Sequence, residues 1–221
     1  MTLRNWWKTS YERTPATIGV VTVLVAVFLV TVLESRSINH NLNGWLGDHW
    51  GTYPPAMTRL PFGPLRAVGG VVLHSGVTHL VFNSFMLYLL GIELERALGH
   101  RIFTALFVVG GLGASAALVF FAPHVDTVGA SGAVYALLVV VTMLRLKMGS
   151  DYQGLLWLIG ANLAFTFLAS GVSVAGHAGG LVTGIVLGAG LWVARSSASY
   201  FRWVLGVGAV SIALIGRGLF L

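Results

Sequence analysis

The chain has 221 residues, of which 56% are hydrophobic and 9% are charged, whereas an ordinary soluble domain has roughly 25% charged residues. So few charges cannot cover the surface of a water-soluble fold of this size, and this excludes a soluble domain. The net charge of +6 comes from basic residues clustered in short segments between apolar runs. This pattern is typical of membrane orientation, and we predict no nucleic-acid partner. The absence of cysteine excludes disulfides, thiol nucleophiles and cysteine-ligated metals.

Seven apolar segments follow one another along the chain, each close to the roughly 20 residues that a helix needs to cross the hydrocarbon core. They are 16–33, 75–93, 102–122, 128–145, 153–170, 173–194 and 201–217. We therefore predict an all-α polytopic membrane protein that is solvated by a lipid bilayer. The 29 glycines of the chain favour helices that pack closely inside the membrane.

Basic residues alternate between the two ends of the predicted spans. They precede the first span and follow the second, fourth and sixth, whereas the alternate connections are nearly bare of charge: Arg4, Lys8, Arg13, Arg96, Arg101, Arg145, Lys147, Arg195 and Arg202. The positive-inside rule then places the N-terminus in the cytoplasm and, after seven spans, the C-terminus outside. Short loops and the lack of a transit-like leader favour a bacterial cell membrane.

The first external connection, 34–74, is unusually long for a compact protein, and loops of this length are commonly functional. It contains Trp45, Trp50 and Tyr53, residue types that favour the membrane interface. We expect this loop to lie half-embedded on the outer surface.

Polar residues inside the predicted spans are informative because each is costly in lipid unless it is partnered or faces water. Ser131 and His177 fall roughly 5 Å below the outer boundary of the fourth and sixth spans, given a rise of about 1.5 Å per residue. His79 lies slightly deeper in the second span, and Asn83 lies one turn further on the same face. Polar side chains from three helices therefore fall at one depth and are able to share a site.

Small residues permit these helices to approach one another closely. Glycines recur at every fourth position of the sixth span, at Gly176, Gly180, Gly184 and Gly188. Gly132 and Ala136 give the fourth span a matching small face. If the two faces pack together, the hydroxyl of Ser131 comes within hydrogen-bond distance of His177, as general-base activation of a serine requires.

Simpler interpretations of these residues remain open. A serine in a membrane helix commonly serves packing or bonds back to its own helix, and a lone histidine often bonds to a neighbouring helix. His74, His79 and His177 offer metal-ligating nitrogens, but no His-Glu-x-x-His motif and no nearby carboxylate accompanies them. The position of the four polar residues at one depth favours catalysis.

Three segments together resemble the rhomboid family of intramembrane serine proteases. The segment from His74 to Asn83 resembles the His-x4-His-x3-Asn element of that family, and Gly129-Ala-Ser131-Gly132 resembles its Gly-x-Ser-Gly segment. The segment from His177 to Gly184 resembles its His-x-x-Gly-x-x-x-Gly element. The elements occur in family order between about residues 65 and 194.

The resemblance implies a fold and a role for each matching position. The fold is a rhomboid-like six-helix core over 16–194, preceded by a cytoplasmic segment, 1–15, and followed by a connection with a C-terminal seventh transmembrane helix, 195–221. The implied roles are Ser131 as nucleophile and His177 as general base, with His79, Asn83 and the Ser131 backbone N–H as the oxyanion hole. Tyr135 would pack on His177 and His74 would hold the loop above the site, with Gly129, Gly132, Gly180 and Gly184 in support.

The resemblance implies an intramembrane endopeptidase that cleaves transmembrane protein substrates near the outer face and needs no cofactor. One departure is Leu65-Arg66, where the family often has Trp-Arg, and it bears on the packing of the external loop. A catalytically silent rhomboid-like protein that binds membrane helices is the alternative, although silent relatives typically lose the serine or the histidine. A small transporter is the third interpretation, but neither interrupted helices nor intramembrane carboxylates support it. The sequence predicts neither the substrate nor the oligomeric state.

Overall fold

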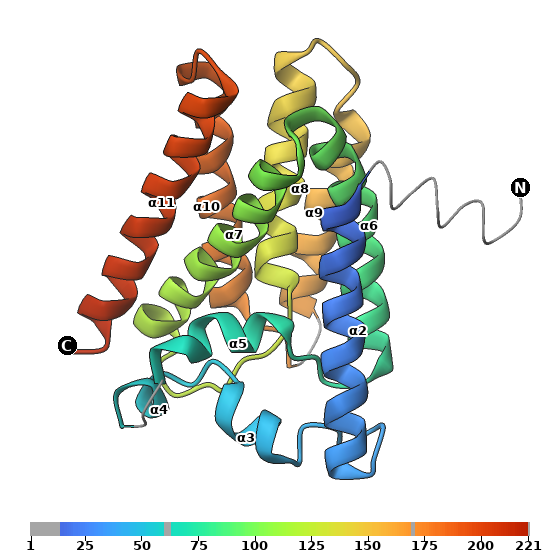
Figure 1. Cartoon of the computed structure of the whole chain (residues 1–221), viewed down its shortest axis with the longest axis vertical. Coiled ribbons are helices and arrows are strands. Elements are labelled where there is room, and N and C mark those ends of the chain that lie inside the picture. Colours follow the sequence, from blue (N-terminus) through green and yellow to red (C-terminus); the bar gives the residue numbers. More distant parts are fainter. Residues whose placement is uncertain (1–13, 60–62, 169–170, 221) are drawn as a thin grey trace, which may run out of the picture.

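A computed structural model describes residues 14–59, 63–168 and 171–220, and these residues form a bundle of long helices with a helical cap at one end (Figure 1). Within these ranges the chain forms no strand, and an isolated bridge joins Thr52 to Thr127. The long helices are α2 (Pro15–Ser35), α6 (Val77–Leu98), α7 (His100–Phe121), α8 (Ser131–Lys147), α9 (Gln153–Leu168), α10 (Val174–Val193) and α11 (Ser197–Gly218).

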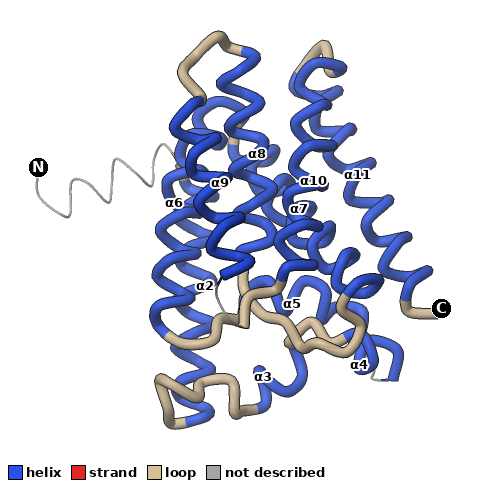
Figure 2. The backbone as a smooth tube through the Cα atoms, turned by 180° about the vertical axis from the view of Figure 1, so that it is seen from behind, coloured by secondary structure: helices blue, strands red, loops and turns tan. Residues whose placement is uncertain are grey.

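Each predicted span falls on one of these helices, and the prediction of an all-α polytopic membrane protein is confirmed. Among the described residues, five helices are long and apolar enough to cross a membrane: α2, α6, α7, α10 and α11. Helices α8 and α9 are shorter, with 17 and 16 residues, and run beside the others within the bundle (Figure 2). The predicted segment 1–15 lies outside the described residues except for its last two, as do the final two residues of the predicted span 153–170.

Helix α8 lies at the centre of the bundle and is buried on nearly every side, between α6, α7 and α10. Its run from Ala133 to Val141 is apolar all round apart from the Tyr135 hydroxyl, which is the pattern of a helix surrounded by other helices. The helix begins at Ser131 rather than at residue 128, because residues 128–130 form an irregular turn. In Figure 1 the yellow-green segment before α8 runs past α5 and into the bundle before the helix starts.

The long connection between α2 and α6 is largely helical, which the sequence did not predict. It contains α3 (Trp45–Trp50), α4 (Pro54–Arg59), the short 3₁₀ helix η1 (Gly63–Leu65) and α5 (Arg66–Val72). These elements gather at one end of the bundle, and α2 begins at the opposite end (Figure 1). Helices α6, α8 and α10 all begin on the side of this helical cap, so their N-terminal residues converge beneath it.

Candidate active site

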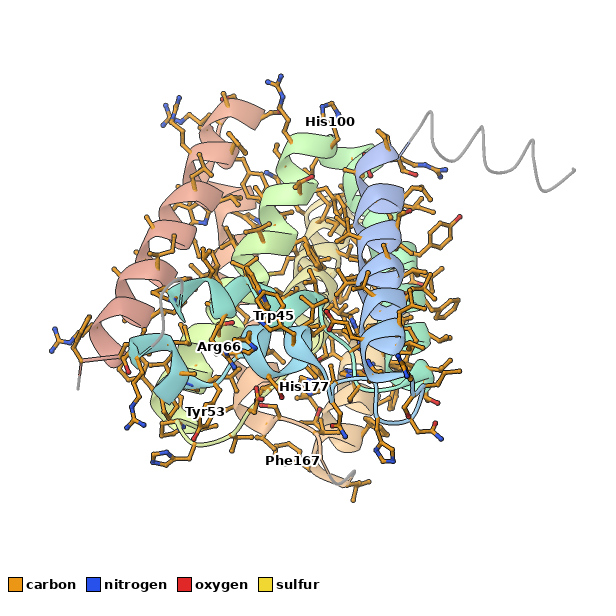
Figure 3. The ribbon with its side chains drawn as sticks, turned by 60° about the horizontal axis from the view of Figure 1, so that its bottom comes forward. Trp45, Tyr53, Arg66, His100, Phe167 and His177 are labelled. Carbon is orange, nitrogen blue, oxygen red and sulfur yellow. The ribbon has the colours of Figure 1, made fainter. Side chains whose placement is uncertain are left out.

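The Ser131 hydroxyl and the His177 imidazole face one another across the contact between α8 and α10. Ser131 is the first residue of α8 and His177 lies in the first turn of α10. The distance from His177 Nε2 to Ser131 Oγ is 2.8 Å, which is a hydrogen bond. His177 is 7% exposed and Ser131 is half-buried. Figure 3 shows His177 at the end of the molecule that carries Trp45, Tyr53 and Arg66, with His100 at the other end.

Glycines bring the two helices together at the predicted positions. The backbone of Gly180 lies against the carbonyl of Gly132, and that of Gly184 lies against Ala136. Gly132 in turn lies against Ala114 of α7 and the carbonyl of Gly176. A side chain at any of these glycines would separate the helices, and with them Ser131 and His177.

A tight turn before α8 aims Ser131 into the site. Gly129 has a φ of +121°, a conformation that L side chains rarely adopt. Its N–H donates to the carbonyl of Gly70 in α5 at 2.8 Å, which ties the turn to the helical cap. The edge of the His79 ring lies directly over Gly129, where a Cβ would be 2.6 Å from Nε2 of His79.

His79 is oriented from the loop that precedes α6. Its Nδ1 accepts from the backbone N–H of Ser75 at 3.3 Å, with the Ser75 hydroxyl at 3.2 Å. Because Nδ1 is an acceptor, a neutral His79 carries its proton on Nε2, the nitrogen that lies over Gly129. Asn83 is 3% exposed, and one of its amide hydrogens goes to the carbonyl of His79 at 2.9 Å. His79 therefore presents a donor group to the turn that carries Ser131, and Asn83 lies one helical turn further along α6, bonded to the His79 carbonyl.

His74 is fully buried in the loop between α5 and α6, outside the membrane-spanning helices. Its Nε2 faces the backbone N–H of Ala130 at 3.5 Å, and its Nδ1 faces the carbonyl of Val72 at 3.3 Å. The rings of His74 and His79 meet edge to face with centroids 5.0 Å apart. Burial, assisted by the neighbouring His79, lowers the pKa of His74 to about 4, which keeps the ring neutral and able to accept from Ala130.

Tyr135 packs on His177, with its ring centroid 4.5 Å from that of His177 and the planes 31° apart. Its hydroxyl lies 2.7 Å from the hydroxyl of Thr166 in α9. Sequence reasoning missed Thr166, whose hydroxyl is also 2.7 Å from Nδ1 of His177. A signal was present, because Asn162 and Thr166 form a polar i, i+4 pair in the outer half of the fifth span.

A small cavity of about 20 Å³ opens beside Ser131 and His177 and is lined in part by Gly129, Thr127 and Ser173. This volume is enough for one water molecule, given the roughly 10–15 Å³ that a water requires. Among the described residues, no group of three or more His, Cys, Asp or Glu side chains is arranged to hold a metal ion.

Comparison with known proteins agrees with these observations. A family model described as the Rhomboid domain matches residues 62–194. Rhomboid protease GluP of Bacillus subtilis is 29% identical over 154 residues, covering 67% of this chain and 30% of that protein. RHOMBOID-like protein 2 of Arabidopsis thaliana is 29% identical over 163 residues, covering 71% and 45%. Rhomboid protease AarA of Providencia stuartii is 27% identical over 213 residues, covering 77% and 70%.

This chain spans less than half the length of the first two of these relatives. The matched segment nevertheless contains every polar residue of the site described above, from His74 to His177. The chain belongs to the rhomboid family.

Proposed function

We propose that this protein is an intramembrane serine endopeptidase that cleaves transmembrane segments near the outer face of the membrane through a dyad of Ser131 and His177. The observation that carries the proposal is the part-buried 2.8 Å hydrogen bond between His177 Nε2 and Ser131 Oγ, formed where α8 and α10 meet. A serine hydroxyl is a weak nucleophile, and an adjacent imidazole that removes its proton is the usual means of activating it.

The reaction would follow the acyl-enzyme course of other serine hydrolases. Ser131 Oγ attacks the carbonyl carbon of the scissile peptide as its proton moves to Nε2 of His177. The carbon–nitrogen bond then breaks, and His177 returns the proton to the leaving amine. A water molecule attacks the resulting ester, with His177 again as base, and releases the second product. The cavity beside the dyad is large enough to supply this water.

Three donors would stabilise the oxyanion that forms during attack. One is the backbone N–H of Ser131, the first residue of α8, which has no acceptor within its own helix. The helix dipole adds a positive potential at this N-terminus. The other two would come from α6: the Nε2–H of His79, which lies over Gly129, and the second amide hydrogen of Asn83. Donors of this kind commonly contribute roughly 10²–10³ each in rate.

The substrate would be a transmembrane protein whose helix unwinds where it meets the site. Ser131 is half-buried at the start of α8, beneath the helical cap, and the small cavity lies beside it. The basic residues Arg96, Arg145 and Arg195 lie at or beyond the distal ends of α6, α8 and α10, opposite the cap. By the positive-inside rule that end faces the cytoplasm and the site faces outward.

The test is cleavage of a model transmembrane substrate by the purified protein in detergent or liposomes, together with labelling by a fluorophosphonate. Wild type is expected to cleave and to be labelled, and Ser131→Ala is expected to do neither while still inserting and purifying. The matched control is Ser211→Ala in α11, which removes a serine hydroxyl bonded only to its own helix and is expected to behave as wild type. A wild-type protein that is inert in both assays would instead support the silent, helix-binding alternative. Cleavage by Ser131→Ala would overturn the assignment of the nucleophile.

A further inference from the structure

Thr166 of helix α9 is buried in the interior of the molecule. It is the only buried residue of α9, and Phe167 and Trp157 of the same helix are exposed. Figure 3 shows Phe167 at the same end of the bundle as His177. The Thr166 hydroxyl lies within hydrogen-bond distance of three groups at once: His177 Nδ1 at 2.7 Å, the Tyr135 hydroxyl at 2.7 Å and the Asn162 carbonyl at 2.8 Å.

The three contacts together favour one direction for each hydrogen bond. A threonine hydroxyl has one hydrogen to donate and two lone pairs to accept with. The carbonyl of Asn162 can only accept, so the hydroxyl of Thr166 donates to it. The two lone pairs then accept from the Tyr135 hydroxyl and from His177, which requires a proton on His177 Nδ1.

This arrangement leaves Nε2 of His177 unprotonated, facing the Ser131 hydroxyl at 2.8 Å. In the opposite arrangement Thr166 would donate to Nδ1, Nε2 would carry the proton, and the bond from Thr166 to the carbonyl of Asn162 would be lost. The observed network therefore favours the tautomer that can accept the serine proton by one hydrogen bond. Such a bond shifts an equilibrium by roughly 2- to 10-fold.

We propose that Thr166 is a positioning residue that holds His177 in the Nδ1–H tautomer and fixes its ring, the place that a carboxylate takes in three-residue serine hydrolase sites. The consequence for catalysis rests on the proposed function, whereas the tautomer itself does not. Because a neutral hydroxyl replaces a carboxylate, its removal is expected to cost less than the loss of a triad aspartate.

The experiment compares three variants in the transmembrane substrate assay. Thr166→Val keeps the shape and removes the hydroxyl, and its kcat is expected to fall by about 10-fold, the upper end of what one hydrogen bond contributes, with KM within twofold of wild type. Thr166→Ser restores the hydroxyl and is expected to recover kcat to within about threefold. The control is Thr142→Val in α8, where a buried threonine hydroxyl bonds only to the carbonyl of Leu138, and wild-type kinetics are expected.

A second readout reports the tautomer directly. In protein labelled with ¹⁵N-histidine, the His177 signals are assigned by their loss in His177→Gln, and wild type is expected to show a protonated Nδ1 and an unprotonated Nε2. Thr166→Val is expected to show a mixture of tautomers. A protonated Nε2 in wild type, or equal kinetics and spectra for Thr166→Val and Thr142→Val, would overturn the role of Thr166. If wild type shows the Nδ1–H tautomer but cleaves nothing, the proposed function fails and the assignment of Thr166 stands.

Discussion

The backbone of Gly180 in α10 lies directly on the carbonyl oxygen of Gly132 in α8, one residue after Ser131. A Cβ at Gly180 would overlap this oxygen, and a backbone atom cannot move aside as the end of a side chain can. The contact sets the separation of the two helices that carry Ser131 and His177.

Gly180→Ala is therefore expected to lower the free energy of unfolding in detergent by about 3 kcal/mol. Activity should fall further than stability alone explains, because a displacement of about 1 Å at a catalytic pair can cost roughly 100-fold in rate. Gly206→Ala in α11 is the control, since a Cβ there meets nothing within 4 Å. The melting temperatures of the two variants are compared with that of wild type. If both variants melt at the wild-type temperature, the contact at Gly180 does not set the helix separation.

The turn at Gly129 gives a second prediction, on rate rather than on global stability. An alanine at this position would adopt a strained φ of +121° and push into the ring of His79. Displacement of His79 removes a proposed oxyanion donor, so kcat of Gly129→Ala is expected to fall about 100-fold. Gly154→Ala in α9, where a Cβ meets open space, should retain wild-type kcat. Steady-state kinetics that do not separate these variants would argue against the placement of His79.

The sequence was most informative where lipid makes polar residues costly. The lengths of the apolar segments located all seven long helices. The shared depth of Ser131 and His177 predicted that the two residues lie close together. The spacing of Gly180 and Gly184 predicted the helix contact that brings them together. These inferences succeed because each depends on local periodicity and on a single constraint, the thickness of the membrane.

The remainder depends on contacts between distant residues, which no local pattern specifies. The short helices α3, α4 and α5 pack on one another and on the end of the bundle. Nothing in the composition of 34–74 indicated them. The polar pair of Asn162 and Thr166 was a local signal, but the partner of Thr166, His177, lies on another helix and only the folded structure identifies it. The start of α8 at Ser131 depends on the bond from Gly129 to Gly70, a partner 59 residues away (129 − 70).

Arg66 organises the helical cap although its preceding residue is Leu65 rather than tryptophan. The Arg66 side chain is 3% exposed, and it donates from Nε to the carbonyl of Gly51 at 2.7 Å and from both terminal nitrogens to the carbonyl of Asp48. Arg66→Gln leaves these carbonyls without their donors and is expected to cost about 3 kcal/mol. Arg59→Gln, at an exposed arginine of α4, should change the unfolding free energy by less than about 0.5 kcal/mol. Equal melting temperatures for the two variants would count against a structural role for Arg66.

Glu95 fastens the start of α2 to the end of α6. Its buried carboxylate accepts from the N–H of Ala16 at 2.9 Å and from the N–H and hydroxyl of Thr17, both at 2.7 Å. It thereby caps a helix that has no side-chain cap of its own. Glu95→Gln places an amide hydrogen against these donors, and a loss of about 2 kcal/mol is expected.

The control lies on the same helix. Glu93 pairs with Arg145 at 2.6 Å, but both side chains are about one-third exposed, so Glu93→Gln should cost less than about 1 kcal/mol. Chemical unfolding in mixed micelles ranks the two variants. The capping role of Glu95 is excluded if Glu93→Gln is the less stable protein.

His74 predicts how stability depends on pH. Burial lowers its pKa from 6.5 to about 4, so the unfolded chain binds this proton more readily than the folded chain does. The associated stability is fully present above pH 6.5 and is lost as the pH falls from 6.5 towards 4, by on the order of 3 kcal/mol. Protonation also removes the acceptor that faces the N–H of Ala130, next to Ser131.

His74→Gln cannot titrate, so its melting temperature should fall less steeply over this interval than that of wild type. His100→Gln, at an exposed histidine on the opposite end of the bundle, should keep the wild-type slope. If the slope of His74→Gln matches that of wild type, the acid sensitivity arises elsewhere in the protein.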